Sequence, residues 1–113
     1  MDRNFRLSDR LGVGVKVMKP SEVLPAHRET IRRLVLDAGM ANPRVFGSVV
    51  YGDDIDGSDL DILVDPAPKT SLLDVAGLQI QIEQALGIRV DLLTPRGLPP
   101  KFREIVLREA QPV

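Results

Sequence analysis

Apolar residues along the chain recur with helical spacing in three segments and gather into short continuous runs in three others. The segments with helical spacing cover residues 21–39, 71–87 and 99–110. The continuous runs, which have the length and composition of strands, cover residues 44–46, 59–64 and 88–93. The predicted order is helix, strand, strand, helix, strand, helix.

The ends of the predicted helices carry recognisable capping residues. Ser21 is the expected N-cap of the first helix, which Gly39 ends. Ser71 followed three residues later by Asp74 resembles a capping box, and Gly87 ends that second helix. The third helix places four apolar side chains on one side, where we expect them to join the core: Phe102, Ile105, Val106 and Leu107.

The run Ile62-Leu63-Val64 is apolar on both faces of its strand, which predicts a central, covered strand. Residues 1–20 contain Gly12, Gly14 and Pro20 and look like an irregular leader, and Met18 could be the natural start. We therefore expect one domain at residues 21–113, because 113 residues with 43% hydrophobic content support one core but not two.

Composition excludes several classes of protein. The chain has no Cys and a single His, which removes disulfide frameworks and thiolate zinc sites and leaves little for a histidine-based metal site. A formal charge of −1 gives no basic footprint for direct nucleic-acid binding. The apolar run at residues 11–18 is interrupted by Lys16 and is too short for a membrane span. The expected location is the cytoplasm.

The most informative chemistry lies between the first two predicted strands. Gly47 and Ser48 form a tight turn whose backbone N–H groups suit phosphate oxygens. Asp59 and Asp61, two residues apart, should leave one face of a strand, where their repulsion favours a bound cation. A calcium loop starting at Asp54 is disfavoured, because its sixth position is Asp59 rather than Gly. The pattern indicates a metal-assisted nucleotide site.

A third carboxylate, Asp91, lies inside the apolar run of the last predicted strand. If that strand is the neighbour of the Asp59/Asp61 strand, three carboxylates meet on one patch, as needed to hold two Mg²⁺ ions and a triphosphate. The alternative is a structural pair, in which Asp91 binds Arg89 or Arg44 across strands.

Gly47-Ser48, ten intervening residues, Asp59-Leu60-Asp61 and the later Asp91 resemble the signature of the DNA polymerase β-type nucleotidyltransferases. The resemblance is to their smallest branch, the minimal nucleotidyltransferases or MNT proteins, and it extends from Ser21 to the C-terminus. It implies an α/β (α+β) fold with a small mixed sheet of about three to four strands and helices packed mainly on one side.

The resemblance also implies roles for individual residues. Gly47 and Ser48 would hold the β and γ phosphates of ATP, and Asp59 and Asp61 would bridge two Mg²⁺ ions. Asp91 would bind the ion that activates the attacking hydroxyl and could take its proton.

One position departs from the pattern of the family. MNT proteins commonly read Gly-Ser-x-Ala-Arg-Gly, whereas this chain has Tyr51 where the arginine stands. A phenol brings no charge to the phosphates. The candidates for supplying the missing charge are Arg44, Lys69 and Arg96.

MNT proteins are typically paired with a helical HEPN-domain ribonuclease toxin. The resemblance implies an antitoxin that transfers AMP from ATP to a tyrosine of the toxin, in a hetero-oligomer with it. A weakly active or inactive antitoxin that neutralises the toxin by binding is the alternative, and an aminoglycoside-type nucleotidyltransferase comes third.

Overall fold

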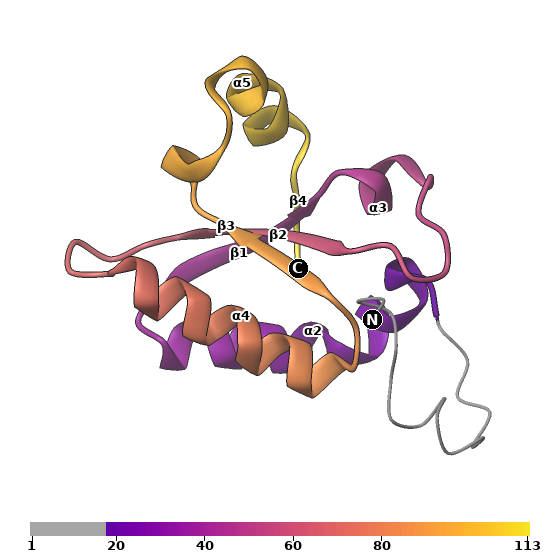
Figure 1. The fold of residues 1–113 in the computed structure, drawn as a ribbon, viewed down its shortest axis with the longest axis horizontal. Coiled ribbons are helices and arrows are strands. Elements are labelled where there is room, and N and C mark those ends of the chain that lie inside the picture. The colour runs from indigo at the N-terminus through magenta and orange to yellow at the C-terminus, as the bar shows by residue number, and fades with distance from the viewer. Residues whose placement is uncertain (1–17) are drawn as a thin grey trace, which may run out of the picture.

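Residues 18–113, the part of the chain that the computed structural model describes, form a four-stranded mixed sheet with helices on both faces (Figure 1). The predicted leader, 1–20, lies outside the described residues as far as residue 17. The elements follow in the order α2 (Pro20–Asp37), β1 (Ala41–Phe46), α3 (Ser48–Tyr51), β2 (Leu60–Asp65), α4 (Leu72–Leu86), β3 (Val90–Leu93), the short 3₁₀ helix η1 (Pro95–Gly97), α5 (Pro100–Glu109) and β4 (Gln111–Pro112).

The strands lie side by side in the order β3-β2-β1-β4. β2 pairs with β3 in parallel and with β1 in antiparallel orientation, and β4 adds antiparallel to β1. β2 is thus an inner strand, and Ile62, Leu63 and Val64 are all 0% exposed. This confirms the prediction of a central, covered strand. The two residues of β4 are too few to give a periodic signal, and the sequence did not predict this strand.

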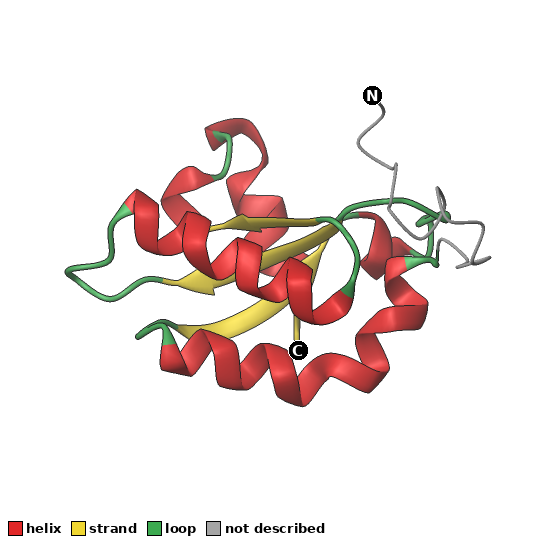
Figure 2. Cartoon of the chain, turned by 60° about the horizontal axis from the view of Figure 1, so that its bottom comes forward, coloured by secondary structure: helices red, strands yellow, loops and turns green. Residues whose placement is uncertain are grey.

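The two long helices, α2 and α4, cover one face of the sheet, and Figure 2 shows them lying across the strands from that side. The core between them and the sheet includes Ile31, Val35, Leu78 and Ile82, as well as the strand residues that alternate toward them. α3 and α5 lie over the opposite face (Figure 1). None of the helices between residues 18 and 113 combines the length and the apolar character that a membrane span requires.

The predicted N-cap of the first helix is wrong by two residues. Pro20 occupies the first helical turn, where its fixed φ and missing N–H cost nothing, so that Lys19 is the N-cap. Ser21 instead donates its backbone N–H to Asp54 Oδ2 at 2.8 Å. The capping box of α4 is confirmed: Ser71 Oγ accepts from the N–H of Asp74, and Asp74 Oδ2 accepts from the N–H of Ser71.

The expected apolar side of the last helix does not enter the core. Phe102 and Ile105 in α5 are 51% and 43% exposed. The reason is that α5 lies over the face of the sheet opposite the two long helices, where no second helix of similar length from residues 18–113 covers it. Leu72 at the start of α4 is likewise exposed, because α4 turns Leu78, Ile82 and Leu86 toward the sheet.

α4 also protects the edge of the sheet. β3 is an edge strand, and two of its backbone N–H groups donate to side chains of α4 instead of to another strand: that of Val90 to Glu83 Oε2 at 2.9 Å and that of Leu92 to Gln79 Oε1 at 3.0 Å. These bonds satisfy donors that would otherwise be free to pair with another chain. They also hold the strand that carries Asp91.

Candidate active site

Asp61 and Asp91 come together on the face of the sheet opposite α2 and α4. They are direct partners in the parallel β2–β3 pair, and Phe46 is the partner of Asp61 in β1. Residues in register share a face, and the neighbours of Asp61 in the chain, Leu60 and Ile62, belong to the core on the other face. Asp91 is exposed and Asp61 is partly buried. Of the three carboxylates predicted to meet on one patch, the register places Asp61 and Asp91 side by side.

Electrostatics mark Asp61 as the unusual member of the pair. Burial, followed by the negative charges of Asp91 and Asp59, raises the pKa of Asp61 to about 6. A carboxyl group with this pKa lacks a compensating positive charge. A divalent cation bound beside it would supply that charge and return the group to its ionised form.

Gly47 brings the chain against Asp61 more closely than any other residue could. Its φ of +76° is one that L side chains rarely adopt, and a Cβ at this position would lie 2.4 Å from Asp61 Oδ2. Glycine is therefore required here both by the backbone conformation and by space. Ser48 follows as the first residue of α3. The turn predicted from Gly47-Ser48 thus lies directly beside the carboxylate pair.

The side chain of Asp59 lies against Arg89. Strand β2 begins at Leu60 rather than at Asp59, and Arg89 Nε lies 3.0 Å from Asp59 Oδ1. That approach is close enough for ionic attraction but poorly aligned for a hydrogen bond, and within residues 18–113 this solvent-shielded oxygen accepts none. Arg89 also donates from Nη2 to the carbonyl of Gly57 at 2.6 Å, which ties the loop before β2 to β3.

The alternative in which Asp91 forms a structural pair with Arg89 or Arg44 is not observed. Arg89 pairs with Asp59, and Arg44 pairs with Asp65 at 3.0 Å. The side of β3 that carries Asp91 is open to solvent.

Across residues 18–113, no three acidic or histidine side chains converge into a ready-made metal cluster. The donor set nevertheless suits a hard divalent cation: two adjacent carboxylates, one with a raised pKa, and a third whose shielded oxygen has no hydrogen-bond donor. Asp59 has one of its two oxygens, Oδ1, against Arg89.

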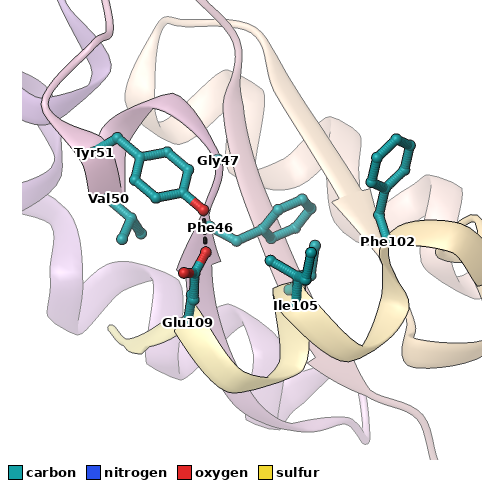
Figure 3. Close-up of a pocket in the computed structure, with 8 residues that line it drawn as sticks. Phe46, Gly47, Val50, Tyr51, Phe102, Ile105 and Glu109 are labelled. Carbon is teal, nitrogen blue, oxygen red and sulfur yellow. Dashed lines mark hydrogen bonds between the residues drawn. The ribbon is translucent and has the colours of Figure 1, made fainter.

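Tyr51 is the last residue of α3, and its side chain is hydrogen bonded. Its hydroxyl donates a hydrogen bond to Glu109 Oε1 at the end of α5 (Figure 3), and this bond, with burial and the charge of Glu109, raises the pKa of Tyr51. Between α3 and α5 lies a cleft of about 300 Å³, with Gly47 in its wall.

None of the three candidate substitutes for the missing arginine lies beside Gly47. Arg44 is held by Asp65 and by the carbonyl of Asn42. Lys69 and Arg96 follow the last residues of β2 and β3, whereas Gly47 lies level with the first residues of those strands.

Three residues with a part in this region had no signal strong enough to be found in the sequence. Arg89 and Glu109 act through side chains on other elements, and such contacts leave no periodic pattern. Asp54, which follows the exposed Asp53, is only 5% exposed and accepts a hydrogen bond from the N–H of Ser21.

Comparisons with known proteins agree with this geometry. The sequence profile of the "Nucleotidyltransferase domain" family matches residues 24–113. The chain is similar to the protein adenylyltransferase MntA of Thermococcus cleftensis, with 39% identity over 77% of this chain and 85% of the relative. A Methanocaldococcus jannaschii protein, also assigned as a protein adenylyltransferase, is 35% identical over 68% of this chain and 83% of its own length.

Solved structures show the same architecture. One described as a minimal nucleotidyltransferase superposes with a TM-score of 0.73 at 46% identity, over 82% of this chain and 95% of the other. A toxin–antitoxin crystal structure with AMP-PNP superposes with a TM-score of 0.65 at 24% identity, over 75% of this chain and 70% of the other. At that lower identity the likeness establishes the fold alone.

Proposed function

The chain belongs to the nucleotidyltransferase domain family, and from this membership we propose that it transfers AMP from ATP, with Mg²⁺, to a tyrosine of a HEPN-domain toxin. The observation that carries the proposal is the Asp61–Asp91 pair directly beside the Gly47 turn. The similarity to a protein adenylyltransferase supports transfer to a protein. The toxin–antitoxin structures of the same fold support a toxin as the partner, in a hetero-oligomer with this chain.

The proposal gives each residue of the site a role. Asp61 and Asp91, together with Asp59, would hold two Mg²⁺ ions. Bound Mg²⁺ would neutralise charge on the triphosphate and lower the pKa of the attacking hydroxyl. Gly47, which leaves its backbone accessible, and Ser48, with its hydroxyl, would hold the β and γ phosphates.

The proposed reaction is a phosphoryl-type transfer at the α phosphorus of ATP. The phenolic oxygen of the acceptor tyrosine forms a bond to that phosphorus while the bond between the α phosphorus and the bridging oxygen breaks, and pyrophosphate leaves. Asp91 is exposed on the open face and can accept the phenolic proton. The chain contributes position and charge rather than a covalent intermediate.

A second candidate function is neutralisation of the toxin by binding alone. Two observations favour it: Tyr51 is bonded to Glu109 where the family carries an arginine, and Asp59 is engaged by Arg89. Both contacts reduce what the site offers to a metal-bound triphosphate. In this reading the carboxylate pair has no role in neutralisation.

The two candidates separate in one transfer assay. ATP labelled on the α phosphate is incubated with Mg²⁺, the chain and its purified HEPN partner, and the label on the partner is followed over time. Transfer by the wild-type chain and none by Asp61→Asn supports the enzyme. If the wild-type chain forms a complex with its partner and leaves it unlabelled, the proposal is wrong and the binding function stands.

A further inference from the structure

The side of α4 that points away from the sheet is apolar although it faces solvent. Leu73, Ala76, Gly77 and Ile80 follow one another with helical spacing and share this side, which we call the α4 face. Leu73 is 83% exposed and Ile80 is 52% exposed, and the two small residues between them are exposed as well. Figure 2 views the molecule from this side, where α4 lies in front of the strands.

The α4 face lacks the charged residues that normally cover the solvent side of a helix. The 15 residues of α4 include two charged ones, Asp74 and Glu83, and both are used within the fold. Asp74 caps the helix, and Glu83 accepts the N–H of Val90. Charged residues recur along α2, by contrast: Glu22, Arg28, Glu29, Arg32, Arg33 and Asp37. The α4 face is therefore suited to contact with another apolar surface.

Gly77, at the centre of the α4 face, is not required by the packing of residues 18–113. Its φ is outside the left-handed region, and a Cβ at this position would meet no atom within 4 Å. Glycine is among the least favourable residues inside a helix, because it has the most backbone freedom to lose. What a glycine on an exposed helix does permit is the close approach of a second helix.

We propose that the α4 face is the contact between two copies of this chain, in which two α4 helices cross antiparallel. The pattern of the face is symmetric, since Leu73 and Ile80 lie equally far in the sequence from the midpoint of Ala76 and Gly77. A two-fold axis through that midpoint places Leu73 of each copy against Ile80 of the other. A contact around a two-fold axis has to be self-complementary in this way, whereas a contact with a different protein does not.

The charges around the α4 face fit the same arrangement. Lys69 precedes α4 and is exposed, so an antiparallel pair brings it to the last turn of α4 in the second copy. That turn contains Glu83 and no basic residue, and its terminal carbonyl groups carry partial negative charge. A parallel pair would instead place Lys69 beside Lys69 and Asp74 beside Asp74. Charge therefore favours the antiparallel pair.

Pairing through α4 leaves the carboxylate site open. α4 covers one face of the sheet, whereas Asp61 and Asp91 lie on the other face (Figure 1). The two sites of a dimer would therefore face away from the contact. The inference goes beyond the proposed function and does not depend on it.

Sedimentation equilibrium of the full chain measures the association. A contact of two helices buries less than the roughly 1,200–2,000 Å² of a standard interface, so the dissociation constant should be about 10–100 μM. Ile80→Lys should leave a monomer, because each copy would bury an unpaired charge against Leu73 of the other. Leu107→Lys, the same change at an exposed leucine of α5, is the control and should keep the dimer. A wild-type chain that stays monomeric at millimolar concentration overturns the proposal.

The direction of the pair can be tested with single cysteines, because the chain has none of its own. Ala76→Cys lies beside the two-fold axis and should form a disulfide between two copies on oxidation. Leu73→Cys should not, since antiparallel helices hold the two residues about 10 Å apart along the axis, and a disulfide needs Cα atoms within about 7 Å. Mixed Leu73→Cys and Ile80→Cys chains should crosslink. Leu73→Cys crosslinking with itself as fast as Ala76→Cys would contradict the antiparallel pair.

Gly77→Gln separates a role in this contact from a role in the fold. Gln favours a helix more than Gly does and would meet open space in the monomer, so urea unfolding should show a more stable monomer. The same side chain should hold the two helices apart and raise the dissociation constant about tenfold or more. A Gly77→Gln chain that dimerises as well as wild type would contradict the close approach of the helices.

The HEPN-domain partner is the other candidate for the α4 face. If the wild-type chain is monomeric and Ile80→Lys abolishes binding of the purified HEPN partner, the face docks that protein and the contact between two copies is wrong. Dimers that persist in Ile80→Lys would also overturn the proposal. Neither result bears on AMP transfer, which the labelled-ATP assay decides independently.

Discussion

At the scale of single residues, Asp61 shows how a site can weaken the fold that carries it. Its pKa in the folded protein, about 6, is above the ordinary value of 3.8. Ionisation of Asp61 therefore opposes folding. The protonated carboxyl group makes its full contribution to the stability of the fold below about pH 4, and this contribution is lost as the pH rises through about 6. Without a metal, the protein is less stable at neutral pH on account of this group.

Asp61→Asn should accordingly stabilise the metal-free protein at pH 7, by about 1–2 kcal/mol after allowing for solvent screening of a partly exposed group. The advantage should largely disappear at pH 4, where the wild-type carboxyl group is protonated. Urea unfolding of both proteins at the two pH values, in the presence of a chelator, measures this. A variant no more stable than wild type at pH 7 would contradict the electrostatic account.

Replacement of Arg89 should lower the stability of the metal-free protein, whereas replacement of Asp61 should raise it. Arg89 lies against Asp59 and binds the carbonyl of Gly57. Because Arg89 competes with a cation for Asp59, Arg89→Gln should raise Mg²⁺ affinity severalfold while lowering metal-free stability by about 1 kcal/mol. Calorimetric titration with Mg²⁺ measures the first effect.

The matched control for Arg89 is Arg96→Gln, which removes an exposed arginine at the other end of the sheet and should change neither quantity. A lower Mg²⁺ affinity in Arg89→Gln would mean that Arg89 orients Asp59 for the metal rather than competing with it.

At the scale of elements, the bonds from α4 to β3 determine where Asp91 lies. Gln79 accepts the N–H of Leu92, and Glu83 accepts that of Val90. Gln79→Ala would leave a partly buried N–H without a partner and should cost about 1 kcal/mol of stability. Gln81→Ala, an exposed glutamine on the same helix, is the control and should cost little. Equal losses in urea unfolding would show that the edge bond adds nothing.

An element could be predicted from the sequence where its pattern depends only on residues that are neighbours in the chain. Ile62-Leu63-Val64 predicted an inner strand, and Ser71 with Asp74 predicted the start of α4, because both patterns depend on neighbouring residues. The exposure of Phe102 in α5 could not be read, since helical spacing shows which side is apolar but not whether another element covers it. The start of α2 was missed because Pro20 was taken as a breaker rather than as a first-turn residue.

At the scale of the whole molecule, the same distinction applies to the site. Gly47, Asp61 and Asp91 could be named from their motif and its spacing, but the sequence brought Asp91 to Asp61 only on the condition that their strands are neighbours, which the parallel β2–β3 pair fulfils. The partners of Asp59 and Tyr51 could not be named, since Arg89 and Glu109 reach them from distant elements. The residues predicted from the sequence thus supply the turn and the carboxylates of the site. The contacts that were not predicted hold Asp59 and Tyr51 in interactions with Arg89 and Glu109.

These restraints bear on how the molecule neutralises its proposed partner. A transferase acts many times, so with Mg-ATP a small amount of the chain should inactivate a large excess of the HEPN ribonuclease. A binding protein inactivates only a fixed number of equivalents. The double variant Asp61→Asn/Asp91→Asn should lose transfer while its fold remains, because Asp91 is exposed and Asp61 opposes folding at neutral pH.

Residual ribonuclease activity, measured against the ratio of this chain to its partner, distinguishes the two modes of action. Wild type with Mg-ATP should neutralise at ratios far below one, and omission of ATP should move its curve to that of the double variant. Size-exclusion chromatography should show that the double variant still binds the partner, because the substitutions leave α2, α4 and the outer surface of α5 unchanged. If the wild-type curve is the same with and without Mg-ATP, neutralisation depends on binding alone, and the carboxylate pair must be explained in another way.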